Sequence, residues 1–166
     1  MSWREDARRI RWETFEGAYG SASTVLDELE DLAAGRDEGS VSYMHQGEVY
    51  EVTPHIIPFI VAIVEDVSLD AGARAMSLET LAYMAESEPP SLIGDRYNPF
   101  TRQMERARSP RRIAQAQWTH ATHEALMKQR ERVAALSKLQ GDARVTDAAR
   151  MVLTALDGIA PKNARD

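Results

Sequence analysis

Residues 44–66 read MHQGEVYEVTPHIIPFIVAIVED, and this stretch decides the fold. A polar turn centred on Gly47 leads into a helix-start signal. Thr53 fits the N-cap and Pro54 fits the first helical position, where its missing N–H costs nothing. The helix that follows is apolar on most sides, and its broad apolar face contains Ile56, Ile57, Phe59, Ile60, Ile63, Val64 and Val67. A helix of this kind is buried between neighbours.

Helical periodicity continues on both sides of this central helix. Before it, apolar residues recur from Ala22 to Ala33 after a cap at Ser21 or Ser23. The opposite side of that helix carries four carboxylates, on Asp27, Glu28, Glu30 and Asp31. After the central helix, Asp70 caps a predicted helix over 71–86. Two antiparallel helices joined by a short polar link are the basic unit of a helical repeat.

The second half of the chain is less regular. Residues 89–109 are interrupted by proline and glycine, so we expect an irregular loop there, with a short helix near 99–107. Helices follow within 110–157, the first of them starting at Ser109-Pro110 and reaching about Gln140. Its predicted buried stripe contains Ala114, Trp118, Ala121, Ala125, Val133 and Leu136. With a polar tail at 158–166, the chain is predicted to form one all-α domain, a short degenerate α-solenoid.

Several motifs resemble a family of actinobacterial HEAT-repeat-like proteins. They are Trp12, Ala18-Tyr19-Gly20-Ser21-Ala22, the run His45-Gln46-Gly47-Glu48-Val49-Tyr50-Glu51-Val52-Thr53, and Pro58-Phe59. The resemblance covers roughly residues 10–88 and implies an α-solenoid fragment. It transfers architecture and little chemistry, because helical-repeat folds mostly provide binding surfaces.

Composition narrows the classes of function. The 166 residues contain no cysteine, which excludes disulfides and thiolate metal sites. A formal net charge of −6 disfavours broad nucleic-acid binding, which needs a cationic surface. The longest apolar run, 56–64, is too short to span a bilayer, and the N-terminus is charged where a signal peptide would be apolar. These features indicate a cytoplasmic protein that does not enter a membrane.

The turn before the central helix is the first candidate site. His45, beside Gln46 and Gly47 and close to Tyr50, has a side chain that can act as an acid or base or contact a ligand. The structural alternative is that Gly47 permits a positive-φ turn whose backbone groups are satisfied by the His45 and Gln46 side chains.

Two further candidates lie in the C-terminal half. His120 and His123 share one side of the long helix, at a spacing that can hold a transition metal or that simply places both on a solvated face. Clustered arginines can grip phosphates, as in HEAT-like DNA glycosylases, or can be ordinary surface charge. That basic stretch contains Arg102, Arg106, Arg108, Arg111 and Arg112.

The last two candidates are surfaces. The acidic side of the first clear helix, with Asp27, Glu28 and Asp31, can attract a basic partner or can be only a solvated face. Met76, Tyr83 and Met84 project from the helix over 71–86 and either pack under a later helix or meet a partner.

The sequence therefore favours a non-enzymatic protein-interaction module without a cofactor or metal. An adaptor, or an immunity-type protein that masks a basic toxin, fits this description. The alternatives are a DNA-binding or DNA glycosylase-type HEAT-like protein and a metal-dependent enzyme that uses His120 and His123. The sequence leaves the oligomeric state open.

Overall fold

A computed structural model describes residues 2–36, 41–98, 102–139 and 141–159. The chain forms a mostly helical single domain, with 59% of its residues in helices. The helices are α1 (Trp3–Ala7), the 3-10 turn η1 (Trp12–Thr14), α2 (Val25–Ala33), α3 (Thr53–Glu65), α4 (Ala71–Ala85), α5 (Pro110–Lys128), α6 (Arg130–Leu136) and α7 (Ala143–Ile159). No repeated helix pair is identified in the described residues, so the prediction is confirmed at the level of a helical domain.

Three small antiparallel hairpins correct the all-α expectation. Their strands are β1 (Glu16–Gly17) with β2 (Gly20–Ser21), β3 (Met44–His45) with β4 (Glu48–Val49), and β5 (Arg96–Asn98) with β6 (Gln103–Glu105). The third hairpin lies within 89–109, which was expected to be irregular, and its strand β6 occupies 103–105 where a short helix was expected near 99–107; residues 99–101 lie outside the described residues. Strands of two or three residues are too short to show the alternation of apolar and polar residues that predicts a strand, so the sequence did not reveal them.

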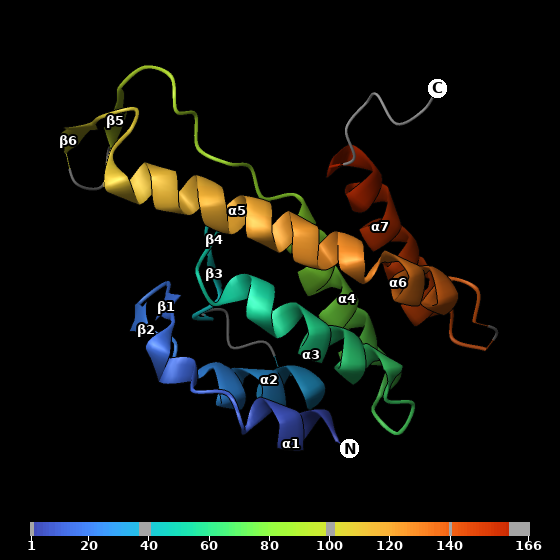
Figure 1. The fold of residues 1–166 in the computed structure, drawn as a ribbon. Helices are drawn as coiled ribbons and strands as arrows, with labels where there is room; N and C mark the ends of the chain where they lie inside the picture. The colour runs from blue at the N-terminus through green and yellow to red at the C-terminus, as the bar shows by residue number, and fades with distance from the viewer. Residues whose placement is uncertain (1, 37–40, 99–101, 140, 160–166) are drawn as a thin grey trace.

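The central helix α3 is buried, as its composition predicts. It lies between α5 on one side and α1 and α2 on the other (Figure 1). Helix α4 packs beside α3, and α7 packs against α4. The side chains of Ile56, Ile60 and Ile63 are fully buried, and Val61 is buried as well. Val67 is 79% exposed, because α3 ends at Glu65 and Val67 falls in the turn beyond it.

The predicted apolar stripe of 110–140 is confirmed only at Val133 and Leu136, which are buried in α6; its members in α5 are only partly buried, and α5 itself buries a mostly polar stripe. Its buried residues are Arg112, Gln115, Thr119, Thr122 and Leu126. Gln115 Nε2 donates to the carbonyl of Val49 over 2.6 Å, and Thr119 Oγ1 donates to the carbonyl of Gln115 over 2.9 Å. These bonds satisfy polar groups that burial would otherwise leave unpaired. The helix also stops at Lys128 rather than near Gln140, and α6 begins after a break at Gln129.

The helix starts at Asp70 and Ser109 are confirmed. Asp70 accepts a hydrogen bond from the N–H of Gly72, and Ser109 accepts one from the N–H of Arg112, ahead of Pro110. The expected serine cap of α2 is wrong, because Ser21 belongs to β2 and the N-cap position is Thr24. Of the predicted tail, residues 160–166 lie outside the described part of the chain. None of the helices in the described part is both long and apolar enough to cross a membrane.

Candidate functional site

The first two hairpins bring distant motifs together. The β3–β4 turn is built from Gln46 and Gly47, with φ angles of 50° and 81°, which confirms the predicted positive-φ turn. His45 does not satisfy the turn backbone. Its Nδ1 lies 2.9 Å from the hydroxyl of Tyr19, at the β1–β2 turn, and the two rings meet edge to face. The Tyr19–His45 contact therefore joins the β1–β2 hairpin to the β3–β4 hairpin.

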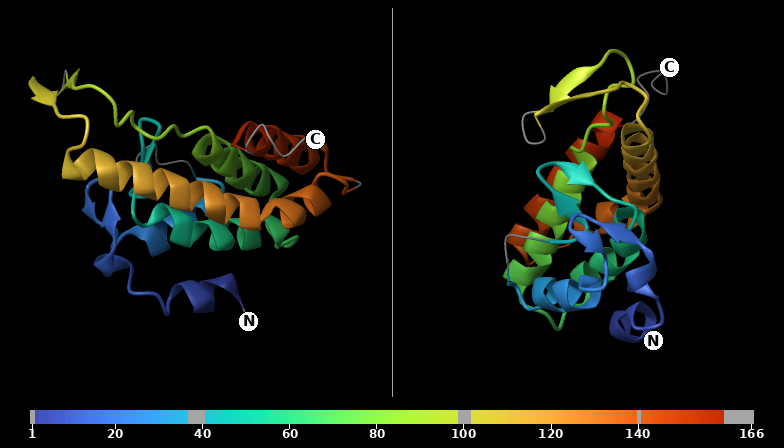
Figure 2. Two further views of the ribbon diagram at one scale, coloured as in Figure 1. Left: turned by 45° about the horizontal axis from the view of Figure 1, so that its top comes forward. Right: turned by 90° about the vertical axis from the view of Figure 1, so that its left-hand side faces the viewer.

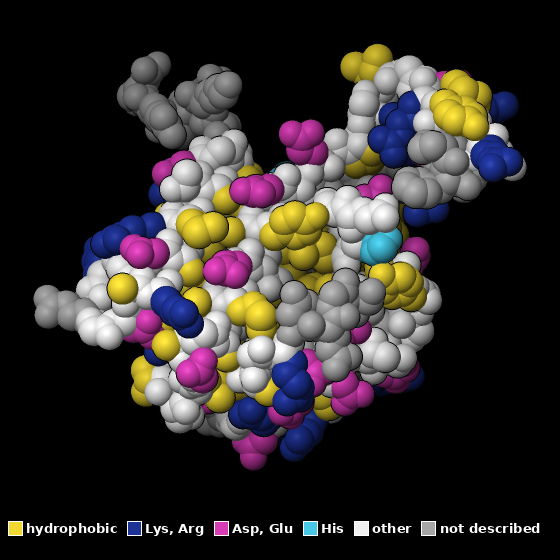
Figure 3. Space-filling view, turned by 180° about the vertical axis from the view of Figure 1, so that it is seen from behind, with side chains coloured by type: hydrophobic (Ala, Val, Ile, Leu, Met, Phe, Trp, Pro, Cys, Tyr) yellow, Lys and Arg dark blue, Asp and Glu magenta, His cyan; other side chains and the backbone are white. Residues whose placement is uncertain are grey.

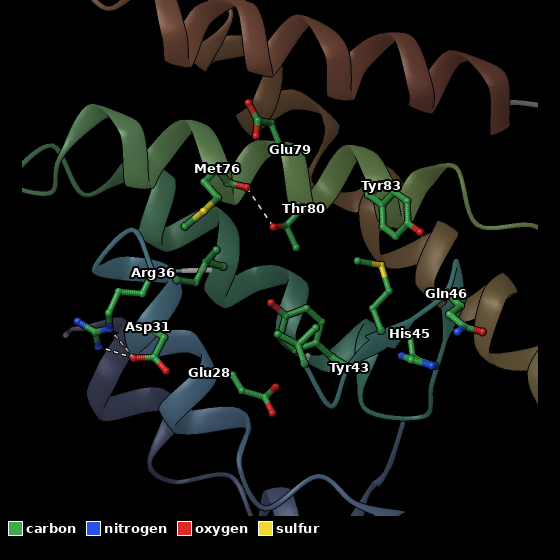
Figure 4. A pocket seen from close by; sticks show the side chains of 13 residues that line it. Glu28, Asp31, Arg36, Tyr43, His45, Gln46, Met76, Glu79, Thr80 and Tyr83 are labelled. Carbon is green, nitrogen blue, oxygen red and sulfur yellow. Dashed lines mark hydrogen bonds and ion pairs between the residues drawn. The ribbon is translucent and has the colours of Figure 1, made fainter. Parts of the chain in front are cut away.

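A pocket opens between α2, the segment 41–46 and α4. Its volume is about 400 Å³. Figure 4 shows α2 on one side, α4 on the other, and the β3–β4 hairpin closing one end. The lining residues are Glu28, Asp31, Leu32, Arg36, Val41, Tyr43, Met44, His45, Gln46, Met76, Glu79, Thr80 and Tyr83. We call this space the α2–α4 pocket.

One wall of the pocket is fixed by Glu28. Its carboxylate accepts hydrogen bonds from the backbone N–H of Ser42 at 3.0 Å and from the Ser42 hydroxyl at 2.9 Å. The carbonyl of Ser42 in turn accepts from the N–H of Ala18 at 2.6 Å. Glu28 thus ties the segment 41–46 to α2, and it is not part of a free acidic surface as the sequence suggested.

The charges that line the pocket are unbalanced. Among the described lining residues, three carboxylates, on Glu28, Asp31 and Glu79, accompany one cation, Arg36. Arg36 pairs with Asp31, and its Nε lies 2.9 Å from Asp31 Oδ1 (Figure 4). The lining therefore carries a net negative charge, and one of its carboxylates already binds a guanidinium group.

Helix α4 contributes the apolar part of the pocket. Met76, Thr80 and Tyr83 are spaced at i, i+4 and i+7, so they share one face of the helix. Their side chains line the pocket opposite Tyr43 (Figure 4), whereas Met84, which was also expected to project, is fully buried. A Cβ at Gly47 would lie 3.8 Å from the hydroxyl of Tyr83, which shows how closely the β3–β4 turn approaches α4.

Six of the eight residues predicted to form a binding site line this one pocket. They are Glu28, Asp31, His45, Gln46, Met76 and Tyr83. Asp27 is exposed on α2 and lies outside the lining. Sequence reasoning missed Arg36, Tyr43, Met44, Glu79 and Thr80. The spacing of Met76, Thr80 and Tyr83 on one helix face was the signal that would have identified Thr80.

Tyr50 was wrongly assigned to an accessible binding surface. It is only 6% exposed and packs against Trp118 of α5, with ring centroids 6.2 Å apart. Burial raises the pKa of its phenol, and the nearby charge of Glu48 raises the pKa further. Tyr50 therefore helps to join the hairpin to α5.

Figure 3 shows how hydrophobic, acidic, basic and histidine side chains are distributed on the face seen from behind. Hydrophobic side chains gather in the middle of that face, with Asp and Glu side chains around them and a histidine toward one edge. An apolar patch with a charged rim is the common anatomy of a protein-binding surface.

The two histidines of α5 serve different contacts. His120 is exposed and lies 3.3 Å from Glu124, whereas His123 is half-buried, with its Nε2 3.4 Å from the Ser87 hydroxyl. Among the described residues, no three His, Asp or Glu side chains are grouped so that they could hold a metal ion. In the part of the chain that the structure describes, His120 and His123 therefore have no third side chain that could complete a metal site with them.

His123 should make stability depend on pH. Burial lowers the pKa of its imidazole below the usual value near 6.5, and the neighbouring His120 lowers it further. The folded state therefore favours the neutral ring, so this contribution is complete above about pH 6.5 and is lost as the pH falls below it. We expect the free energy of unfolding to fall more between pH 7 and 5.5 in the wild type than in His123→Gln. Parallel pH curves from urea titrations of the two proteins would contradict this assignment.

The basic stretch does not form one cluster. Arg112 is buried, and its Nη1 donates to the carbonyl of Gly94 at 3.2 Å, so it fastens the preceding segment to α5. Arg102, Arg106, Arg108 and Arg111 are exposed. The first three lie on or beside the β5–β6 hairpin, away from the α2–α4 pocket.

No protein-family model matches this sequence, and comparisons with curated proteins and with solved structures give no match either.

Proposed function

We propose that this protein is a non-enzymatic interaction module whose α2–α4 pocket receives a basic side chain of a protein partner. The observation that carries the proposal is the pairing of Asp31 with Arg36 inside a lining that holds three carboxylates and one cation. The pocket already accommodates one guanidinium group at its rim and retains an excess of negative charge. Charged groups of this kind steer a basic partner and fix its register.

The apolar lining suits the remainder of a lysine or arginine side chain. Such a side chain buries its aliphatic stem along apolar surface and keeps its charged head near polar groups. Met44 and Met76 are polarizable and adaptable, and the ring of Tyr83 can face a cation. A volume of about 400 Å³ lies within the range of ordinary ligand pockets and exceeds what one side chain fills.

An adaptor or an immunity-type protein would need only such a shaped, charged surface. The pair α3 and α4, two consecutive helices joined by a short link, supports a distant relation to helical-repeat proteins. We keep the HEAT-like origin and the masking of a basic toxin as parts of the proposal. Neither is needed for the pocket to bind a basic side chain.

The proposal is tested with a short capped peptide, acetyl-Gly-Ser-Arg-Ser-Gly-amide, titrated into protein labelled at the methionine methyl groups. The chain has seven methionines, and Met44 and Met76 report directly on the pocket. We expect saturable shifts of these two methyl resonances. The matched peptide with citrulline in place of arginine keeps the shape and loses the charge, so it should bind much more weakly. Equal shifts with both peptides, or none with either, would refute the proposal.

Two variants should change the affinity in opposite directions. Arg36→Ala removes the internal cation and should tighten peptide binding roughly threefold, because a half-exposed ion pair contributes only a fraction of a kcal/mol. Asp31→Asn removes the carboxylate that the peptide would share and should weaken binding by a similar factor. The methyl titration measures both dissociation constants. Changes in the same direction for the two variants would mean that Asp31 is not the recognition group.

A further inference from the structure

The β5–β6 hairpin projects from the body of the domain beside the start of α5. We call its described residues and their flanks, 95–98 and 102–108, the arm. In both views of Figure 2 the arm stands clear of the helical body. An isolated two-stranded hairpin is at best marginally stable in water and gains stability when it packs against another surface.

One face of the arm is apolar and uncovered. Tyr97 and Met104 lie directly opposite one another in the strand register, so they share a face. They are 57% and 62% exposed. On the other face Arg96 lies 3.8 Å from Glu105, which holds the two strands together. The arm therefore presents a small apolar pair to the solvent.

The arm is also basic, although the chain as a whole is acidic. It carries Arg96, Arg102, Arg106 and Arg108 against two carboxylates, those of Asp95 and Glu105. Asp95 is engaged with the N–H of Ala107 at 2.8 Å. Among the described residues, no carboxylate lies within ion-pair distance of Arg102, Arg106 or Arg108. An apolar pair flanked by unpaired arginines is the chemistry that the α2–α4 pocket is proposed to accept.

We propose that the arm of one copy docks over the α2–α4 pocket of a second copy of this chain. This inference rests on the proposed function of the pocket. Tyr97 and Met104 would meet Met44, Met76 and Tyr83, and the arginines would reach the surplus carboxylates. A nucleic acid is the weaker match for the same arm, because phosphates offer no apolar partner and would be repelled by the net charge of −6.

The arm and the pocket are different surfaces, so a single arm-to-pocket contact would join two copies head to tail. Two copies close into a dimer when each arm reaches the other pocket, which gives two identical contacts about one twofold axis. The arm also becomes an internal competitor for the pocket. A basic ligand that occupies the pocket should therefore shift the protein toward the monomer.

Sedimentation velocity of the full chain between about 5 µM and 1 mM tests the proposal. We expect concentration-dependent self-association that weakens as salt rises and screens the charges. An arm variant, Arg102→Glu with Arg106→Glu, and a pocket variant, Asp31→Lys, should each weaken self-association at least tenfold. An equimolar mixture of the two variants should associate again, because it pairs an intact arm with an intact pocket and a reversed arm with a reversed pocket. Arg11→Glu is the control, an equally exposed arginine outside both surfaces, and should have no effect.

Three results would overturn the proposal. They are a monomer at every concentration in low salt, self-association that survives in both variants, and arginine-dependent binding of a DNA duplex without self-association. The peptide titration separates these failures from failure of the pocket. A monomeric chain that still binds the arginine peptide would overturn arm docking alone, whereas a chain that binds neither would overturn both proposals.

Discussion

Replacing Ile60 with aspartate is expected to abolish cooperative folding. Ile60 is fully buried in the middle of α3, the helix that the surrounding helices enclose. A carboxylate there either remains charged without a partner or takes up a proton, and both cost several kcal/mol. That cost is comparable with the whole stability of a domain of this size, about 5–15 kcal/mol. Near-ultraviolet circular dichroism and a thermal melt should show no folded baseline for Ile60→Asp.

Val67→Asp is the matched control for that substitution. It replaces another β-branched apolar residue only seven positions later, at a site that is 79% exposed. The sequence pattern places Val67 on the same buried face as Ile60, so the two interpretations give different expectations. A native-like melt for Val67→Asp, beside an unfolded Ile60→Asp, is the expected outcome. Similar melts for both variants would mean that the burial of α3 is wrongly described.

Arg74→Ala should cost about 3 kcal/mol of stability, near the lower end for a broken buried ion pair. Arg74 is buried, and its Nε donates to the carbonyl of Val64 at 2.7 Å, near the end of α3. Its Nη1 lies 3.4 Å from the carboxylate of Asp142, which precedes α7. One guanidinium thus joins α4 to the end of α3 and to the start of α7. Truncation leaves both acceptors without this donor.

Urea unfolding of Arg74→Ala measures this cost. The midpoint should fall while the slope stays unchanged, because the surface exposed on unfolding is the same. Arg74→Lys should recover only part of the loss, since an ammonium group cannot reach both acceptors in the same geometry. The control is Arg150→Ala, whose side chain is exposed and pairs with Asp147 only one turn away. A loss for Arg74→Ala no larger than that of Arg150→Ala would contradict the assigned role.

The sequence predicted those parts of the fold that depend on local chemistry. The start of α4 at Asp70 and the start of α5 at Ser109-Pro110 follow from capping, and the burial of Ile60 follows from apolar spacing. The polar stripe of α5 does not follow from spacing. Gln115 is buried because its amide meets the carbonyl of Val49, 66 positions away. No local window contains that information.

Six residues of the pocket were singled out from the sequence, but not as parts of one site. His45, Asp31 and Met76 were singled out for separate reasons, and only tertiary packing brings their three segments together. Tyr50 was misjudged for the same reason. Its sequence neighbours do not reveal Trp118, which covers it from α5. The arm was misread as an irregular loop because its strands are only three residues long.

If the α2–α4 pocket binds a basic side chain, as proposed, an isotope-filtered nuclear Overhauser measurement on the peptide complex will place the arginine of the peptide beside the methionines of the pocket. Protein labelled at the methionine methyl groups is mixed with the unlabelled arginine peptide. The expected result is cross-peaks from the arginine side-chain protons to the methyl groups of Met44 and Met76, which line the pocket. Cross-peaks confined to methionines outside the pocket, such as the exposed Met104 of the arm, would contradict the proposal.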